Sequence, residues 1–326
     1  MSCDDGETSE TAGGNAAASD LANREATHVP VLLDAVVELL EPRPGGVVVD
    51  ATLGRGGHAR AMLPAMGPGG TLVGLDRDPG QLAAAGEGLE EAAKRHDVTL
   101  ERVHADFADT RNVLDRMDLQ ADRVLADLGF ASNQVDDAQR GLSFQREGPL
   151  DMRLDPTRGP TAAELVAKLG EKELADLLYE LGEERLSRRI ARKIVERRAT
   201  EPIQSTRQLA SLVRTAYGSH GRGQRIDPAT RTFQALRIAV NDELASLDRL
   251  LRDLPAMVSP QARVGVISFH SLEDRRVKRA FAEWEQRGRG KRVTRKPVTA
   301  DAAESRDNPR SRSAKLRVFA FAASRA

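Results

Sequence analysis

Apolar positions along the chain switch between short buried runs and helical spacing. Three β-branched residues, Val47–Val49, are typical of a strand buried on both faces of a sheet, and a glycine turn and a helix from His58 to Met66 follow. Similar runs predict strands at Thr71–Leu75, Thr99–His104 and Asp122–Leu128, each followed by a helix. Four strand–helix units in series predict an α/β fold with a parallel, doubly wound sheet.

From Asp136 to about Thr230 the strand pattern gives way to helical spacing. Ala229 to Pro255 then predicts one long amphipathic helix. A strand pattern returns at Arg263–His270 (RVGVISFH), with a further helix after it. Final strand candidates are Lys291–Val298 and Lys315–Phe321. The pattern therefore predicts one α/β domain that is interrupted by a helical subdomain.

Composition narrows the class of protein. Hydrophobic residues make up 40% of the chain and charged residues 30%, as in a soluble globular protein. Residues 1–26 contain almost no large apolar side chain, so we expect a disordered N-terminal tail. The single cysteine, Cys3, excludes a disulfide framework and fits a reducing compartment. With no apolar run of membrane length and no leader pattern, we expect a soluble, cytoplasmic protein without membrane contact.

Charge gives no global argument for nucleic-acid binding, because the formal net charge is +0. Aromatic residues make up only 3%, which argues against an RNA surface built on many stacked rings. Two local basic runs, Glu183–Arg198 and Arg287–Lys296, either contact phosphates or are solvated faces.

Acidic residues end the predicted strands. Asp50, Asp76, Asp106 and Asp127 each lie at or just after the carboxyl end of a strand, where parallel sheets bind ligands. The turn at Gly54–Gly57 adds bare backbone N–H groups and a helix N-terminus. Each acid could alternatively be a simple helix N-cap, but the set together predicts a nucleotide-type site.

The turn fits two cofactors. A dinucleotide fingerprint, G-x-G-x-x-G, would need its third glycine at Ala59. Asp76 suits the paired ribose hydroxyls of NAD and of S-adenosylmethionine alike. Asp50, just before the loop, would repel a pyrophosphate but suits the ammonium of a methionine moiety. The acid-ended fourth strand and its loop DLGFASNQ also favour S-adenosylmethionine.

Several motifs resemble one family. DATLGRGGHARAML, GLDRDP, DLGFASNQVDDAQRGLSFQREGPLDMRLDPTRG, ATRTFQALRIAVNDEL and ISFHSLEDRRVKRAF are similar to the MraW family of ribosomal RNA small subunit methyltransferases, over Thr27 to Phe321. The resemblance implies a class I S-adenosylmethionine-dependent methyltransferase. The fold of this class is α/β, with a Rossmann-like parallel sheet whose last strand is antiparallel. The resemblance further implies a first part at 27–135, an inserted helical domain at 136–234 and a second part at 235–326. The implied substrate is N4 of a cytosine in the decoding region of 16S rRNA, in the 30S subunit.

The resemblance also implies the cofactor contacts. Phe107 would border the adenine, and Asp76 would hold the ribose hydroxyls. The methionine part of the cofactor would be contacted by Gly56, Gly57 and His58. Asp127 and Gln134 would complete the pocket. One loop departs from the family pattern, because Ala131 and Asn133 replace a common serine and proline.

Asp127 is the candidate catalytic residue, as the acceptor of a hydrogen bond from the target amine. Its alternative role is that of a cofactor ligand, with the proton lost to water. No metal is expected, because the leaving group is already cationic. His270, with Ser271 after it, lies either on the substrate side or at a simple helix start.

Two other functions stay open. A DNA cytosine-N4 methyltransferase would use the same chemistry, although DLGF lacks the usual pair of prolines. A non-catalytic, S-adenosylmethionine-binding ribosome-assembly factor is the second alternative. The sequence leaves the oligomeric state open, a homodimer included.

Overall fold

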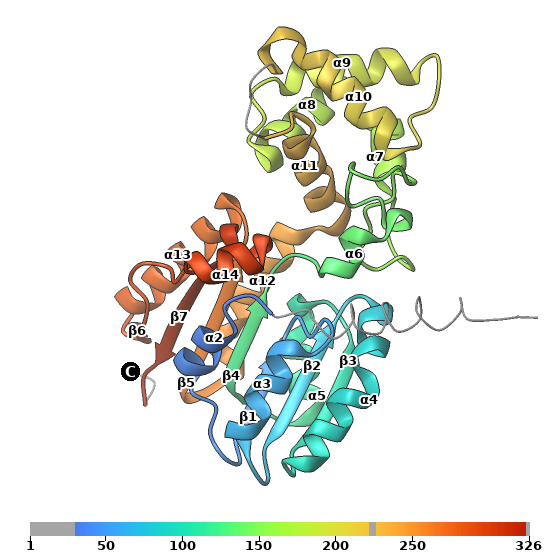
Figure 1. Cartoon of the computed structure of the whole chain (residues 1–326). Helices are drawn as coiled ribbons and strands as arrows, with labels where there is room; N and C mark the ends of the chain where they lie inside the picture. The colour runs from blue at the N-terminus through green and yellow to red at the C-terminus, as the bar shows by residue number, and fades with distance from the viewer. Residues whose placement is uncertain (1–29, 222–225, 324–326) are drawn as a thin grey trace, which may run out of the picture.

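The computed structural model describes residues 30–221 and 226–323, so the predicted tail at 1–26 lies outside the described residues (Figure 1). A seven-stranded sheet has the order β3-β2-β1-β4-β5-β7-β6. Neighbours from β3 to β5 pair in parallel, whereas β7 is antiparallel to β5 and to β6. The strands are β1 (Val47–Asp50), β2 (Thr71–Asp76), β3 (Thr99–His104), β4 (Ala121–Asp127), β5 (Val258–Ser268), β6 (Gly290–Arg292) and β7 (Lys315–Phe321). The predicted sheet with its antiparallel last strand is confirmed.

Helices cover both faces of the sheet, which explains why the central strands β1, β2 and β4 are mostly apolar and buried. One core joins the sheet to α2, α3 and α4, and the other joins it to α5, α12 and α13. The helices that flank the sheet are α2 (Leu33–Leu40), α3 (Gly57–Met66), α4 (Pro79–Arg95), α5 (Thr110–Met117), α12 (Glu243–Met257) and α13 (Ser271–Gln286). The shorter α6 (Ser132–Asp136) and α14 (Ala302–Asp307) lie in connections.

A further set of helices forms the helical domain, which has a hydrophobic core of its own. Figure 1 shows it as a separate layer above the sheet domain, joined through α6 and the α11–α12 connection. Its helices are α7 (Ala162–Lys168), α8 (Glu171–Gly182), α9 (Ser187–Arg198), α10 (Thr206–Tyr217) and α11 (Ala229–Asn241).

The predicted single helix from Ala229 to Pro255 is wrong. Asp242 adopts a left-handed backbone conformation (φ 50°) and separates α11 from α12. Asn241 supports the break, because its side chain accepts from Leu154 N–H and donates to the Met152 carbonyl, both at 2.8 Å. The break lets α11 pack in the helical domain while α12 packs on the sheet. The predicted boundary between residues 234 and 235 therefore falls inside α11.

The strand expected at Lys291–Val298 is also too long. The paired strand β6 ends at Arg292, and beyond it Val298 makes only an isolated bridge with Leu316. In the part of the chain that the structure describes, no helix combines the length and apolar character needed to cross a membrane.

Candidate active site

A cavity of about 430 Å³ opens at the carboxyl ends of β1, β2 and β4 and continues to the start of α12 and α13. Its volume is in the range of small-molecule and cofactor sites. Gly56 is absent from its lining. The predicted residues that do line it are Gly57, His58, Asp76, Phe107, Asp127 and Gln134.

The glycine turn is shaped by close packing. Gly56 has a left-handed φ of 75°, and its N–H donates to the Leu53 carbonyl at 2.7 Å. A Cβ on Gly57 would stand 2.3 Å from the ring of Pro30, which also lines the cavity. Glycine is therefore required at 56 by the turn and at 57 by the approach of another segment.

Asp76 links the glycine turn to the end of β2. Its Oδ2 accepts from Gly54 N–H and its Oδ1 accepts from Asp78 N–H, both at 2.8 Å. Burial raises the pKa of Asp76 to about 6, although these two backbone hydrogen bonds act in the opposite direction. Both carboxyl oxygens are thus oriented before any ligand binds.

Gln134 is buried and holds the loop that follows β4. Its Oε1 accepts from Ala131 N–H at 2.8 Å, and its Nε2 donates to Asp78 Oδ2 at 2.7 Å. Arg140 forms an ion pair with the same buried Asp78 carboxylate. Sequence reasoning missed Asp78 and Arg140, because Asp78 is also an ordinary N-cap of α4 and nothing local marks its distant partners.

Asp127 ends β4 and faces the cavity. Its N–H donates to Thr52 Oγ1 at 2.7 Å, which fixes the backbone against the glycine corner. Among the described residues, its buried Oδ1 has no hydrogen-bond partner. Burial raises the pKa of Asp127 well above its ordinary value, and the charges of Asp50 and Glu273 raise it further. Burial likewise raises the pKa of Asp50 to about 7.

His58 lies in the first turn of α3 and is buried. Its Nε2 is 2.9 Å from the Val31 carbonyl oxygen, which can only accept, so Nε2 carries the proton. Its Nδ1 then faces Asp127 Oδ2 at 3.7 Å. The imidazole thus connects the candidate catalytic acid to the segment before α2.

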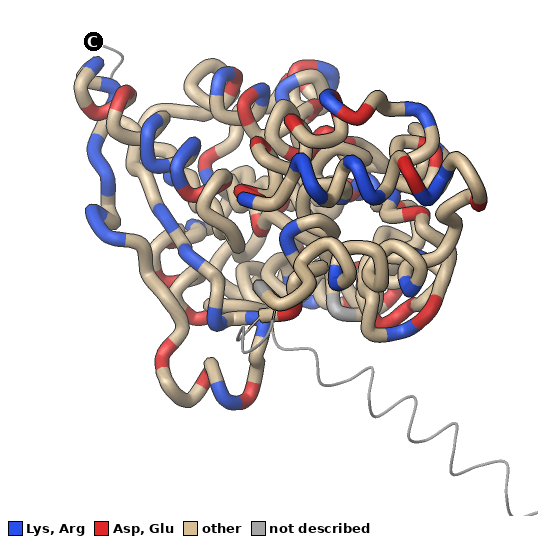
Figure 2. Tube along the Cα trace, turned by 90° about the horizontal axis from the view of Figure 1, so that it is seen from above, with Lys and Arg blue, Asp and Glu red and all other residues tan. Residues whose placement is uncertain are grey.

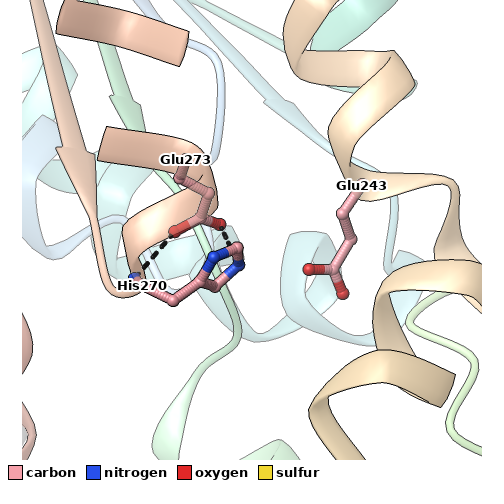
Figure 3. Close-up of side chains that lie close together, drawn as sticks. All are labelled: Glu243, His270 and Glu273. Atoms are coloured by element: carbon pink, nitrogen blue, oxygen red, sulfur yellow. Dashed lines mark hydrogen bonds and ion pairs between the residues drawn. The ribbon is translucent and has the colours of Figure 1, made fainter. Parts of the chain in front are cut away.

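The β5 end of the cavity contains carboxylates that sequence reasoning did not assign. Glu273 Oε2 accepts from the N–H groups of Phe269 and His270, at 2.8 and 3.3 Å, and its Oε1 is 3.2 Å from His270 Nε2. Figure 3 shows Glu243 directed toward this pair from α12. Glu243 and Glu273 line the cavity, whereas His270 is absent from the lining. Glu243 and Glu273 lie in the sequence motifs NDEL and SLED, but only the fold brings these two motifs together.

Glu243 is held by a partly buried arginine. Arg237 Nε and Nη2 each donate to one Glu243 oxygen at 2.8 Å, and the guanidinium lies 4.6 Å from the centre of the Phe130 ring. Phe130, in the loop after β4, also lines the cavity.

The sheet order, its reversed seventh strand and an acid-lined cavity at the carboxyl ends of the strands define a class I methyltransferase fold. The chain belongs to the MraW methylase family, whose model matches residues 25–322. The family prediction is therefore confirmed.

The chain is similar in sequence to several curated proteins along almost their whole length. The chain is 52% identical to ribosomal RNA small subunit methyltransferase H of Synechococcus sp. (strain CC9902), over 90% of this chain and 96% of the relative. It is 48% identical to the protein of the same name from Acidobacterium capsulatum, over 89% and 97%. The chain is 46% identical to the protein of the same name from Syntrophobacter fumaroxidans, over 89% of this chain and 95% of the relative.

Proposed function

We propose that this methyltransferase uses S-adenosylmethionine to methylate N4 of a cytosine in the decoding region of 16S rRNA, within the 30S subunit. The observation that carries the proposal is the place of Asp127 in the wall of the cavity, where its buried Oδ1 has no hydrogen-bond partner among the described residues. The names of the relatives support ribosomal RNA as the substrate class.

The cavity suits this cofactor by chemistry. Asp76 presents an oriented carboxylate for two neighbouring hydroxyls, and Phe107 supplies an apolar wall near it for an adenine. Gly57 and His58 line the cavity, with His58 Nδ1 at 3.7 Å from Asp127 Oδ2, and would border the methionine moiety. In this proposal Gln134 acts through its loop, because its amide is already engaged by Ala131 and Asp78.

When bound, S-adenosylmethionine supplies an electrophilic methyl group beside Asp127. The exocyclic amine of cytosine is a weak nucleophile, because its lone pair is delocalised into the ring. A hydrogen bond from that amine to Asp127 Oδ1 localises the lone pair and takes up the positive charge that develops on nitrogen. A neighbouring cation also lowers the pKa of Asp127 and thereby favours the ionised acceptor.

Basic side chains outside the cavity would contact the RNA backbone. On α9, Arg188, Arg189 and Arg192 are exposed. Figure 2 shows that Lys and Arg are interspersed with Asp and Glu over much of the molecule and form runs on a few segments only, in line with the net charge of +0. RNA contact therefore depends on local patches such as α9.

The decisive test compares 16S rRNA from cells with and without the gene, by mass spectrometry of the nucleosides. We expect loss of N4-methylcytidine at one position and its return when wild-type protein is supplied. Calorimetry with S-adenosylmethionine then distinguishes the alternatives. Cofactor binding with an unchanged methyl mark would favour an assembly factor, and methylation of cytosine in DNA would favour the DNA enzyme.

A further inference from the structure

The cavity extends past Asp127 to an end at β5 and α12 that cofactor binding does not explain. Its lining there includes the carboxyl groups of Asp127, Glu243 and Glu273 and the rings of Phe130 and Phe269, which together we name the amine subsite. We infer that the amine subsite selects an exocyclic amine over a carbonyl oxygen, with Glu273 as a second acceptor beside Asp127. This inference rests on the proposed function.

The selection follows from counting donors. Cytosine carries two N–H bonds on its exocyclic nitrogen, whereas uracil presents at the same place a carbonyl oxygen that only accepts. Two carboxyl groups can accept both N–H bonds, but facing a carbonyl they leave buried acceptors unpaired and repel its oxygen. A site built to bond an N–H group therefore rejects the analogue that lacks it.

Glu273 is oriented for this role and keeps acceptor capacity. It is 3% exposed, its Oε2 accepts both backbone N–H groups at the start of α13, and its Oε1, 3.2 Å from His270 Nε2, keeps a further lone-pair site. The remaining site is available to a ligand in the cavity. Asp127 and Glu273 line the same cavity, and the charge of Glu273 contributes to raising the pKa of Asp127.

Glu273 is also ionised at neutral pH. Burial alone would raise the pKa of Glu273, but its contact with His270, the Phe269 N–H and the charge of Arg237 outweigh burial and hold the pKa below its ordinary value. The acceptor next to Asp127 is thus an anion, which strengthens the preference for N–H donors.

The walls suit a flat base. The ring of Phe269 packs close to the backbone of Gly129, where an added Cβ would stand 3.4 Å from it. Arg237 stacks on the Phe130 ring and is itself paired with Glu243. These contacts fix the position of the Phe130 ring in the wall of the cavity. Aromatic walls with a few polar groups are the usual environment of an extruded base.

A divalent cation is the competing occupant, because ligand atoms of Glu243, His270 and Glu273 all lie within 4.8 Å of one another. The observed pairing favours an amine. Arg237 already engages both oxygens of Glu243, and its positive charge would repel a divalent cation at this place but not a neutral amine.

The test uses 30S particles reconstituted with cytosine or uracil at the target position, as competitors in a methylation assay. For the wild type we expect the cytosine particle to bind at least about tenfold more tightly. In Glu273→Gln, which keeps a side-chain oxygen for the start of α13, we expect this ratio to fall below about threefold, with the affinity for S-adenosylhomocysteine unchanged. Glu243→Gln, which leaves the start of α13 intact, should lower the ratio as well.

Glu183→Gln is the matched control. Glu183 bonds Ser271 and Arg275 of the same helix but lies outside the cavity, so the ratio should stay at the wild-type value. A Glu273→Gln protein that keeps the full preference would overturn the inference. The inference would also be overturned if chelation abolished the wild-type preference for the cytosine particle and Mn²⁺ restored it. The cluster of Glu243, His270 and Glu273 would then hold a cation. If the wild type neither methylates the particle nor binds S-adenosylhomocysteine, the proposed function itself fails.

Discussion

At the β2 end of the cavity, Asp76 accepts two backbone hydrogen bonds and both of its oxygens are oriented. At the β4 end, Asp127 has a buried oxygen without a hydrogen-bond partner among the described residues, and the charges of Asp50 and Glu273 add to burial in raising its pKa. The first arrangement is satisfied in the free protein and suits binding. The second is costly until a donor or a cation enters, which suits a site where charge develops during a reaction.

The largest effect should come from Asp127→Asn, which keeps the shape of the reactive end but removes its charge. We expect methyl transfer to fall by about 10²- to 10⁴-fold, because the acceptor for the amine proton is lost. Affinity for S-adenosylhomocysteine should change only a few-fold, which calorimetry can measure. An equal loss of methyl transfer and of S-adenosylhomocysteine affinity would mean that Asp127 is only a cofactor ligand.

Asp76→Ala tests the binding end. The substitution removes the acceptor for the proposed ribose hydroxyls and leaves the Gly54 and Asp78 N–H groups without their partner. We expect S-adenosylhomocysteine affinity to weaken by about 1.5–3 kcal/mol, or roughly 10- to 150-fold. Asp109→Ala, an acid outside the cavity lining, is the control. Unchanged affinity would remove Asp76 from the binding site.

The buried acids should make the free protein less stable as pH rises. Asp50 and Asp76 have pKa values raised to about 7 and about 6, so the folded state binds more protons than the unfolded state between about pH 4 and pH 7. Their contribution to the free energy of unfolding is therefore present at low pH and is lost as pH rises through these values. Thermal melting from pH 5 to 8 measures this slope, and Asp50→Asn should flatten it.

The smallest effect is expected from Gln134→Ala, because Gln134 acts through the loop. Losing its bonds to Ala131 and Asp78 should raise the KM for S-adenosylmethionine by less than about tenfold, the equivalent of about 1.4 kcal/mol, with kcat nearly unchanged. Steady-state kinetics separate the two constants. A large fall in kcat would instead place the Gln134 side chain at the reaction.

Local patterns in the sequence were enough to predict the sheet, the glycine turn and the acids at the strand ends. Val47–Val49 is apolar because parallel strands are buried on both faces, and Asp76 and Asp127 follow such runs directly. The carboxyl ends of neighbouring parallel strands meet at one edge, so the place of the cavity followed from strand order. Motif resemblance added the family and its cofactor residues.

Only the tertiary structure decided which distant residues meet. The break at Asp242 depends on contacts of Asn241 with a segment about ninety residues earlier, and helical spacing alone cannot reveal it. Gln134 contacts Asp78, and Glu243 approaches Glu273, only because separate elements pack together. The pKa of Asp127 depends on burial and on charges brought in by other strands and helices. Sequence patterns determine local conformation and burial, whereas the pairing of side chains is decided by the fold.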